Sequence, residues 1–217
     1  MRGIVPDADD GPVIFSPDDE PYLGRAAVLL FDQVFLALVA EQYRIGPWTR
    51  AHDMTPLQRA ASEIVPGACS LAFSIRELVR QGYLLAARIL LRPFIERVST
   101  LTYLIEHDET VADWHSGWPH RSRPNLHTRL RTVAGPGNVM AADVAEAFKG
   151  LMNDFNGMVH GDPASAHQSA ILLPSGEPGY TVTKDLGSPS RVDEICSLAS
   201  TFAMALTVRA GEVFPST

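Results

Sequence analysis

The sequence predicts an all-α fold, an antiparallel bundle of about five main helices. Apolar residues recur at helical spacing over most of the chain, and glycine or proline stands where these stretches end. One region breaks the helical period: ILLP and YTVT flank the turn SGEPG. This pattern favours a small β-hairpin-like insertion near residues 168–184.

Length and composition predict a single helical-bundle domain, residues 23–217, preceded by an acidic, proline-rich arm, residues 1–22. A hydrophobic content of 46% is enough for one sizeable core. The net charge of −7 argues against non-specific binding of nucleic acid by the whole protein, so any such contact needs a local basic patch.

The two cysteines, Cys69 and Cys196, fit no zinc or CxxC spacing and are expected to be buried free thiols in a reducing compartment. The N-terminus has no apolar core of signal-peptide length. Charged residues interrupt the apolar runs, so no membrane span is expected. The sequence therefore predicts a cytoplasmic protein with no membrane contact.

The first helix, Arg25–Tyr43, is apolar on nearly all sides and is expected to end at Gly46-Pro47. Such a helix is either central or meets a partner subunit, which favours a homodimer. Thr55-Pro56 opens the second helix, because proline is tolerated in a first turn. That helix is expected to reach about Gln81, with a kink or split at Pro66-Gly67.

The segment from Gly82 to His107 predicts the central helix, since it is apolar round most of its girth. Arg92 and Glu96 are four residues apart on its polar side and can form an ion pair. Pro93 frees the carbonyl of Ile89, and the resulting kink is either a packing device or a way to open a polar site. The polar side carries Arg88, Arg92, Glu96, Ser99 and Tyr103.

The later chain predicts a short helix in 108–117, another in 124–133, a strong helix over 139–160 and a last one over 193–214. The helix over 139–160 has a polar stripe opposite its apolar face. The stripe consists of Glu146, Lys149, Asn153, Asn156 and His160.

If this helix packs beside the central one, the two polar stripes meet, and the catalytic candidates are His160, Arg92, Glu96, Asn153 and Asn156. One interpretation is a structural hydrogen-bond network, since buried charges are normally paired. The other is a polar pocket for an anion, nucleotide or metabolite, with His160 as acid–base. A metal site from Glu96, His160 and Asp162 has no supporting spacing, and neither a metal nor a cofactor is expected.

Trp114–Arg131 is the only clearly basic stretch of an acidic protein. It is either a solvated connector or a phosphate or RNA contact in which Trp114 and Trp118 stack on bases. The candidate binding residues are Arg88, Tyr103, Trp114, Trp118, Arg121, Arg123, Arg129 and Arg131.

Two segments, LLRPFIE around Arg92 and NDFNGMVHG ending at Gly161, resemble the HEPN superfamily of all-helical bacterial proteins over roughly residues 55–162. The resemblance implies a helical bundle, frequent dimerisation and roles in toxin–antitoxin or phage-defence systems. Some members are metal-independent ribonucleases.

The chain departs from the pattern of the active ribonucleases, which carry R-x(4–6)-H. His160 matches the histidine, but Asn153 or Asp154 stands where the arginine belongs. Asparagine cannot supply the fixed positive charge that stabilises a phosphorane. A second formal match, Arg121-x5-His127, lies in the basic stretch.

Three functions remain open. The resemblance favours a bacterial defence or toxin–antitoxin protein that binds nucleotide or RNA and has an antitoxin-like partner. The alternative is a non-catalytic binding or scaffolding module whose polar stripe is structural. A third is a small-molecule enzyme that uses a pocket beside Pro93.

Overall fold

The computed structural model describes residues 20–119, 122–133, 142–160, 170–172, 177–180 and 184–215, and in them the predicted all-α class is confirmed. Most of the expected N-terminal arm lies outside the described residues. The helices are α1 (Ala26–Ala51), α2 (Pro56–Gln81), α3 (Leu84–Glu106), the short 3-10 helix η1 (Asp108–Thr110), α4 (Val111–His115), α5 (Leu126–Leu130), α6 (Ala142–His160) and α8 (Pro189–Val213).

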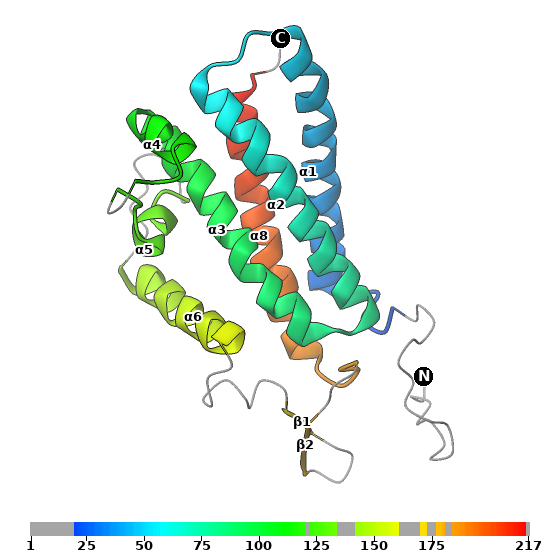
Figure 1. Cartoon of the computed structure of the whole chain (residues 1–217). Helices are drawn as coiled ribbons and strands as arrows, with labels where there is room; N and C mark the ends of the chain where they lie inside the picture. Colours follow the sequence, from blue (N-terminus) through cyan, green and yellow to red (C-terminus); the bar gives the residue numbers. More distant parts are fainter. Residues whose placement is uncertain are drawn as a thin grey trace.

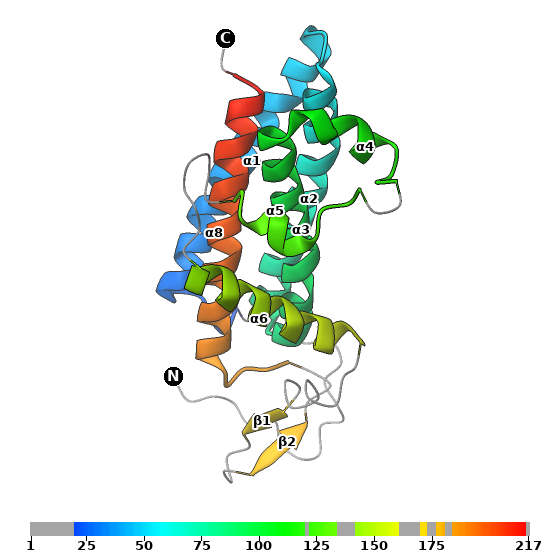
Figure 2. The same ribbon diagram turned by 90° about the vertical axis from the view of Figure 1, so that its left-hand side faces the viewer.

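Helix α3 is the centre of the bundle, as its apolar composition predicts. α2 and α8 pack on one side of it, and α5 and α6 cover another (Figures 1 and 2). Leu91, Phe94 and Val98 on α3 have no exposed surface. Each such side chain contributes about 1.5–3 kcal/mol through its removal from water, so this helix anchors the core.

The prediction of an antiparallel bundle is right for α1 with α2, for α2 with α3 and for α2 with α8, but wrong for α3 with α8. Arg88 near the start of α3 bonds Glu194 near the start of α8, at 3.0 Å. Arg209 near the end of α8 bonds Glu106 at the end of α3, at 2.8 Å. The two helices are therefore parallel.

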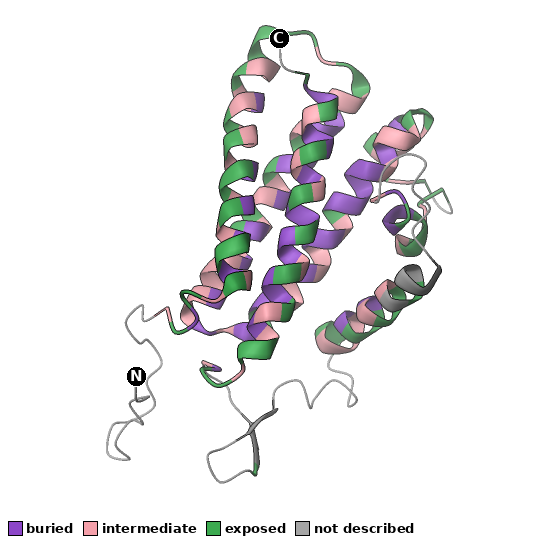
Figure 3. Ribbon diagram, turned by 180° about the vertical axis from the view of Figure 1, so that it is seen from behind, coloured by how far each residue is buried: buried purple, intermediate pink, exposed green. Residues whose placement is uncertain are grey.

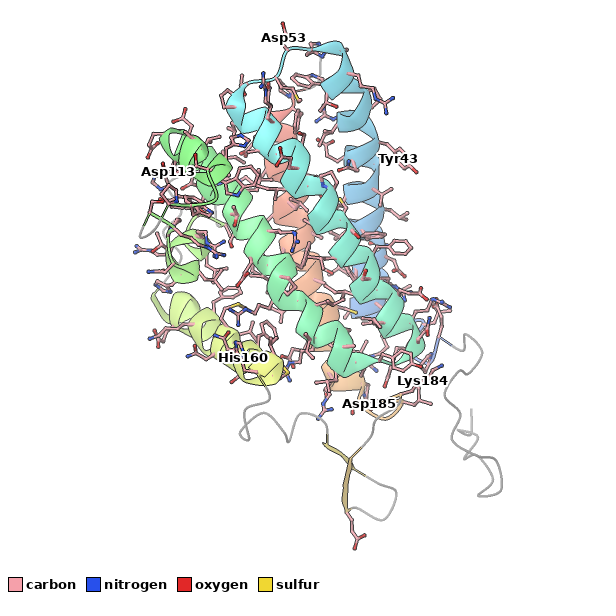
Figure 4. The ribbon with its side chains drawn as sticks, in the orientation of Figure 1. Tyr43, Asp53, Asp113, His160, Lys184 and Asp185 are labelled. Carbon is pink, nitrogen blue, oxygen red and sulfur yellow. The ribbon has the colours of Figure 1, made fainter. Side chains whose placement is uncertain are left out.

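The parallel arrangement arises because the chain between α3 and α8 returns to the end of the bundle where α3 begins. The backbone N–H of Asp185, just before α8, donates to the carbonyl of Gly82, just before α3, at 2.8 Å. Asp185 and Lys184 lie at this lower end in Figure 4. The excursion that contains α5 and α6 thus reverses the direction expected of a simple up-and-down bundle.

Helix α1 does not end at Gly46-Pro47 as predicted but continues to Ala51. Proline removes only one N–H from the helix, and local contacts offset that loss. The Trp48 ring packs edge-on against Phe214, with centroids 5.2 Å apart. Arg44 bonds Glu41 and the carbonyl of Phe214, which ties the last turns of α1 to the end of α8.

Both ends of α2 follow the sequence prediction. Thr55 and Gln58 form a capping box, with N–H···O distances of 3.2 and 2.9 Å, and Pro56 occupies the first turn. Gly82 ends the helix at φ 81°, a left-handed conformation that suits glycine. The helix is continuous through Pro66, so the predicted split is absent.

Two short strands lie within residues 168–184, where the hairpin-like insertion is expected. β1 (Ala170–Leu172) and β2 (Pro178–Tyr180) pair antiparallel, with Ile171 opposite Gly179. Most other residues of this range lie outside the described residues, so the insertion as a whole stays a prediction.

Helix α1 is the least covered of the core helices, and its outer face is exposed along its length (Figure 3). By length and composition alone it is also a candidate membrane span, although the sequence prediction contained none. It passes that test because Asp32 is the only charged residue between Ala26 and Ala40. A helix in a protein core or interface passes the same test of length and composition.

Candidate functional site: a polar pocket between α3, α5 and α6

The polar side of α3 faces the α5–α6 side of the bundle. Arg92 and Glu96 form the predicted i,i+4 ion pair, with Nε 3.2 Å from Oε1. Both side chains remain about one quarter exposed, at 25% and 28%. The pair is therefore neither sealed in the core nor free on the surface.

A pocket of about 440 Å³ opens beside Arg92, between α3, α5 and α6. Its apolar wall consists of Leu126, Leu130 and Met152. The remaining lining is polar and consists of Arg92, Asn125, His127, Glu146, Lys149, Asn153 and Asn156. Two fixed cations, one carboxylate, three amides and an imidazole thus face one space.

Helix α6 supplies one wall of the pocket because its polar residues recur every three or four positions. Lys149, Asn153 and Asn156 lie on successive turns, and Met152 between them is buried. Lys149 bonds Glu146 at 3.1 Å, and both side chains are more than half exposed. They form the open edge of the pocket, where an exposed ion pair contributes little stability.

The short helix α5 supplies the opposite wall. Asn125 caps it by accepting the Thr128 N–H at 2.8 Å, which fixes the start of a helix too short to be stable alone. Leu130 is buried, and His127 is exposed. The cap therefore orients an apolar side chain and an imidazole toward the same cavity.

Arg129 lies behind this wall and is only 3% exposed. Its Nη1 donates to Thr100 Oγ1 at 2.5 Å and to the carbonyl of Glu96 at 3.3 Å. Its Nε has no hydrogen-bond partner among the described residues, and no carboxylate there forms an ion pair with it. Burial and then the nearby Arg123 lower the pKa of Arg129, whereas Glu96 raises it. The guanidinium stays cationic at neutral pH.

The structure brings most of the predicted catalytic residues to one place. Arg92, Asn153 and Asn156 line the pocket, and Glu96 adjoins it through Arg92. His160 does not line it: this residue is exposed at the last position of α6, at the lower end of that helix in Figure 4. The sequence could not place His160, because helical spacing shows which face of α6 a residue occupies but not which part of α6 lies beside the pocket.

The predicted binding residues are scattered. Arg88 bonds Glu194 of α8, Arg123 and Arg131 are exposed, and Arg121 lies outside the described residues. Trp118 packs near Tyr103 at 6.5 Å between ring centroids, and Trp114 packs against His115 at 5.0 Å. Neither tryptophan lines the pocket, so they provide no stacking platform there.

Four polar residues of the pocket were not among the sequence candidates: Asn125, His127, Glu146 and Lys149. The spacing of Glu146 and Lys149 had already placed them on the polar stripe of their helix. Asn125 and His127 lie in the basic stretch, whose dominant sequence pattern is its arginines. An Asn directly before a short apolar segment is a helix-capping signal, and it could have located this wall.

Among the residues that the structure describes, no group of three or more His, Cys, Asp or Glu side chains is placed to hold a metal ion. Asp162, which belonged to the metal set considered from the sequence, lies outside those residues. The chemistry available in the pocket is that of two cations, one carboxylate, three amides and an imidazole.

One family model, described as a family of unknown function (DUF5677), matches residues 58–133. The similarity covers about a third of the chain, from α2 to the end of the basic stretch, and stops before α6. It includes Arg92, Glu96 and Arg129 but not the α6 wall of the pocket. No curated protein and no solved structure matches the chain significantly.

Proposed function

We propose that the pocket between α3, α5 and α6 binds a phosphate-bearing ligand, either a nucleotide or a segment of RNA. The observation that carries the proposal is the convergence of Arg92, Lys149 and three asparagines on one cavity. Guanidinium, ammonium and amide N–H groups are the donors that phosphate oxygens accept.

The electrostatics of the site support an anionic ligand despite the net charge of −7. Arg92 and Lys149 line the pocket, buried Arg129 lies behind it, and Arg123 and Arg131 are exposed on the segment around α5. Glu96 and Glu146 offset two of these five cations. A local positive excess remains, which the basic stretch had indicated and which nucleic-acid contact in an acidic protein requires.

The shape of the pocket supports a nucleotide or nucleobase more than a bare phosphate ion. Its volume of about 440 Å³ lies within the usual range of ligand sites, roughly 300–1,000 Å³. Leu126, Leu130 and Met152 give an apolar surface on which a base can lie. The amides can bond its polar edge.

The proposal is one of binding. His160 lies outside the pocket, and the chain has asparagine where the ribonuclease pattern has arginine. These two features favour binding over cleavage. The HEPN resemblance supports a bacterial defence or toxin–antitoxin protein that contacts RNA or nucleotide in the cytoplasm and has an antitoxin-like partner. The alternative, a scaffolding module, is supported by Arg92–Glu96 and Lys149–Glu146, since paired charges are satisfied without a ligand.

Binding of a fluorescent single-stranded RNA and of a fluorescent adenine nucleotide, followed by anisotropy, tests the proposal. Lys149→Glu should weaken binding at least about tenfold, the ~1.4 kcal/mol expected of one lost charge-assisted contact. Arg59→Glu is the matched control, because Arg59 is an exposed cation on α2 outside the pocket and the net charge changes equally. Absence of binding by the wild type, or equal loss in both variants, would refute a pocket ligand.

The ribonuclease alternative has its own readout. RNA cleavage by the wild type that disappears in His160→Ala, at an unchanged melting temperature, would show that His160 is catalytic. Because His160 is exposed and outside the pocket, the proposal expects no cleavage by either protein and unchanged RNA affinity in the variant.

A further inference from the structure

The outer face of α1 is apolar and uncovered. Leu29, Leu36 and Tyr43 are 46%, 68% and 79% exposed, and Tyr43 projects away from the bundle in Figure 4. Phe73 on α2, 61% exposed and 5.8 Å from the Phe35 ring, extends this face sideways. Scattered exposed leucines are ordinary, but an aligned row on one helix marks an interaction surface.

The charged side chains of α1 between Ala26 and Arg44 are only partly exposed and are paired within the bundle. Asp32 pairs with Arg76 of α2, and Glu41 pairs with Arg44. Arg25, just before α1, pairs with Asp193 of α8. Between Ala26 and Tyr43 the exposed positions of the helix therefore carry no charge at all.

The spacing of the exposed residues is that of a contact between two helices. Leu29, Gln33, Leu36, Ala40 and Tyr43 are separated by alternate steps of four and three residues, and all are exposed. This is the repeat that keeps one seam of a helix against a partner helix. A helix that lies in a membrane surface is rich in Lys and Arg beside its apolar face, whereas the exposed positions of α1 between Ala26 and Tyr43 carry no cation.

The seam is self-complementary when two copies run antiparallel about a two-fold axis between Gln33 and Leu36. Each large residue then faces a smaller or more flexible one of the second copy: Leu29 meets Ala40, Tyr43 meets Ala26, and Leu36 meets Gln33. A parallel pair would place alanine on alanine and leave gaps between the larger layers. The antiparallel arrangement also opposes the two helix dipoles.

The exposed apolar side chains supply about half of the area that a dimer interface needs. Leu29, Leu30, Leu36, Tyr43 and Phe73 expose on the order of 400 Å² per copy, taking about 200 Å² for a whole aromatic side chain and about 100 Å² for a leucine. A specific interface needs about 800 Å² per partner. The rest of a dimer interface would have to come from the exposed alanines, Gln33 and the polar side chains that border the ~27 Å seam.

We propose that the protein is a two-fold symmetric homodimer held by antiparallel α1 helices. The inference is independent of the ligand in the pocket, because α6 and α1 lie on opposite sides of the bundle (Figure 1).

Sedimentation equilibrium of the full chain tests the dimer. The wild type should be dimeric at micromolar concentration, and Leu36→Glu should raise the dissociation constant by about a hundredfold or more, because two unpaired carboxylates enter the seam. Its melting temperature under conditions where both proteins are monomeric should not change, since Leu36 is exposed. Val159→Glu is the control: this exposed apolar residue of α6 should leave the dimer intact.

Cysteine cross-linking tests the orientation. The double variant Leu29→Cys with Ala40→Cys should form a disulfide-linked dimer under oxidation, and the single variant Tyr43→Cys should not exceed the wild-type background. Cross-linking of Tyr43→Cys alone would overturn the antiparallel arrangement. A monomeric wild type overturns the dimer, as does a Leu36→Glu variant that stays dimeric. Wild-type protein that cosediments with phosphatidylcholine–phosphatidylglycerol vesicles and dissociates on them assigns the face to lipid and overturns it too.

Discussion

Arg209 on α8 and Arg129 on α5 are two arginines buried almost equally, at 4% and 3% exposure, beside the same central helix. Arg209 bonds Glu106 at 2.8 Å and Glu212 at 2.7 Å, and donates to the carbonyl of Thr132 at 3.2 Å. Arg129 has one hydroxyl and one carbonyl as partners and no ion pair among the described residues. The two guanidinium groups are equally buried, but among the described residues only that of Arg209 is neutralised by carboxylates.

The comparison separates a structural charge from one that the site can use. A buried arginine with two carboxylates is compensated, and its removal strands those groups. A buried arginine with only neutral partners costs desolvation energy in the folded state, yet it keeps a positive field near the pocket. Charge that is not cancelled locally is a feature of binding sites.

The largest effect is expected from Arg209→Met. The substitution removes both ion pairs and leaves the Thr132 carbonyl without this donor, so the free energy of unfolding should fall by about 3 kcal/mol. Urea denaturation measures it. An effect no larger than that of Arg129→Met would break the distinction between the two arginines.

Arg129→Met should act mainly on binding. Because a buried cation that forms no ion pair in the described part of the chain is replaced by an apolar group of similar length, the free energy of unfolding should change by less than about 1 kcal/mol. Affinity for the fluorescent RNA should fall about fivefold, since a charge near the pocket contributes roughly 1 kcal/mol at intermediate dielectric. A loss of several kcal/mol in stability with unchanged affinity would show that Arg129, like Arg209, has a structural role.

Tyr22→Phe measures how much one buried, uncharged hydroxyl contributes to the free energy of unfolding. The Tyr22 hydroxyl donates to the carbonyl of Asp185 at 2.5 Å, and its removal should cost about 1 kcal/mol at neutral pH. Desolvation raises the pKa of Tyr22 from 10.0 to about 12. The folded state therefore holds the phenol proton longer than the unfolded chain. Its stabilising contribution is complete below pH 10 and is lost as the pH rises through about 12.

This pH dependence has a direct check. Urea midpoints of the wild type should fall between pH 10 and about 12 more steeply than those of Tyr22→Phe. Parallel curves for the two proteins would show that the hydroxyl is equally solvated in both states.

The smallest effect is expected from Thr102→Val. Thr102 bonds Thr132, and Thr132 in turn bonds both Arg129 and Arg209. Thr102 Oγ1 bonds Thr132 Oγ1 at 2.9 Å, while Thr132 Oγ1 keeps its own bond to the Arg129 carbonyl at 2.6 Å. No polar group on Thr132 is orphaned, so thermal unfolding should show a loss of only about 0.5 kcal/mol. A loss above 2 kcal/mol would mean that the two arginines belong to one cooperative network.

The sequence determined what depends on near neighbours in the chain. The Thr55–Gln58 cap, the end of α2 at Gly82 and the Arg92–Glu96 pair all follow from spacings of a few residues, and the structure contains each of them. The polar stripe of α6 was visible for the same reason, and four of its five members line the pocket beside Arg92. Local hydrogen bonding and helical periodicity carry this information.

The tertiary structure alone decided which faces meet and how far they overlap. It made α8 parallel to α3, buried Arg129 with no carboxylate partner among the described residues, left His160 outside the pocket and carried α1 through Gly46-Pro47 to Ala51. These outcomes depend on contacts between residues a hundred positions apart, such as Arg88 with Glu194. A helical pattern fixes a residue's direction around its own axis, but packing against other helices fixes the order, polarity and offset of those axes.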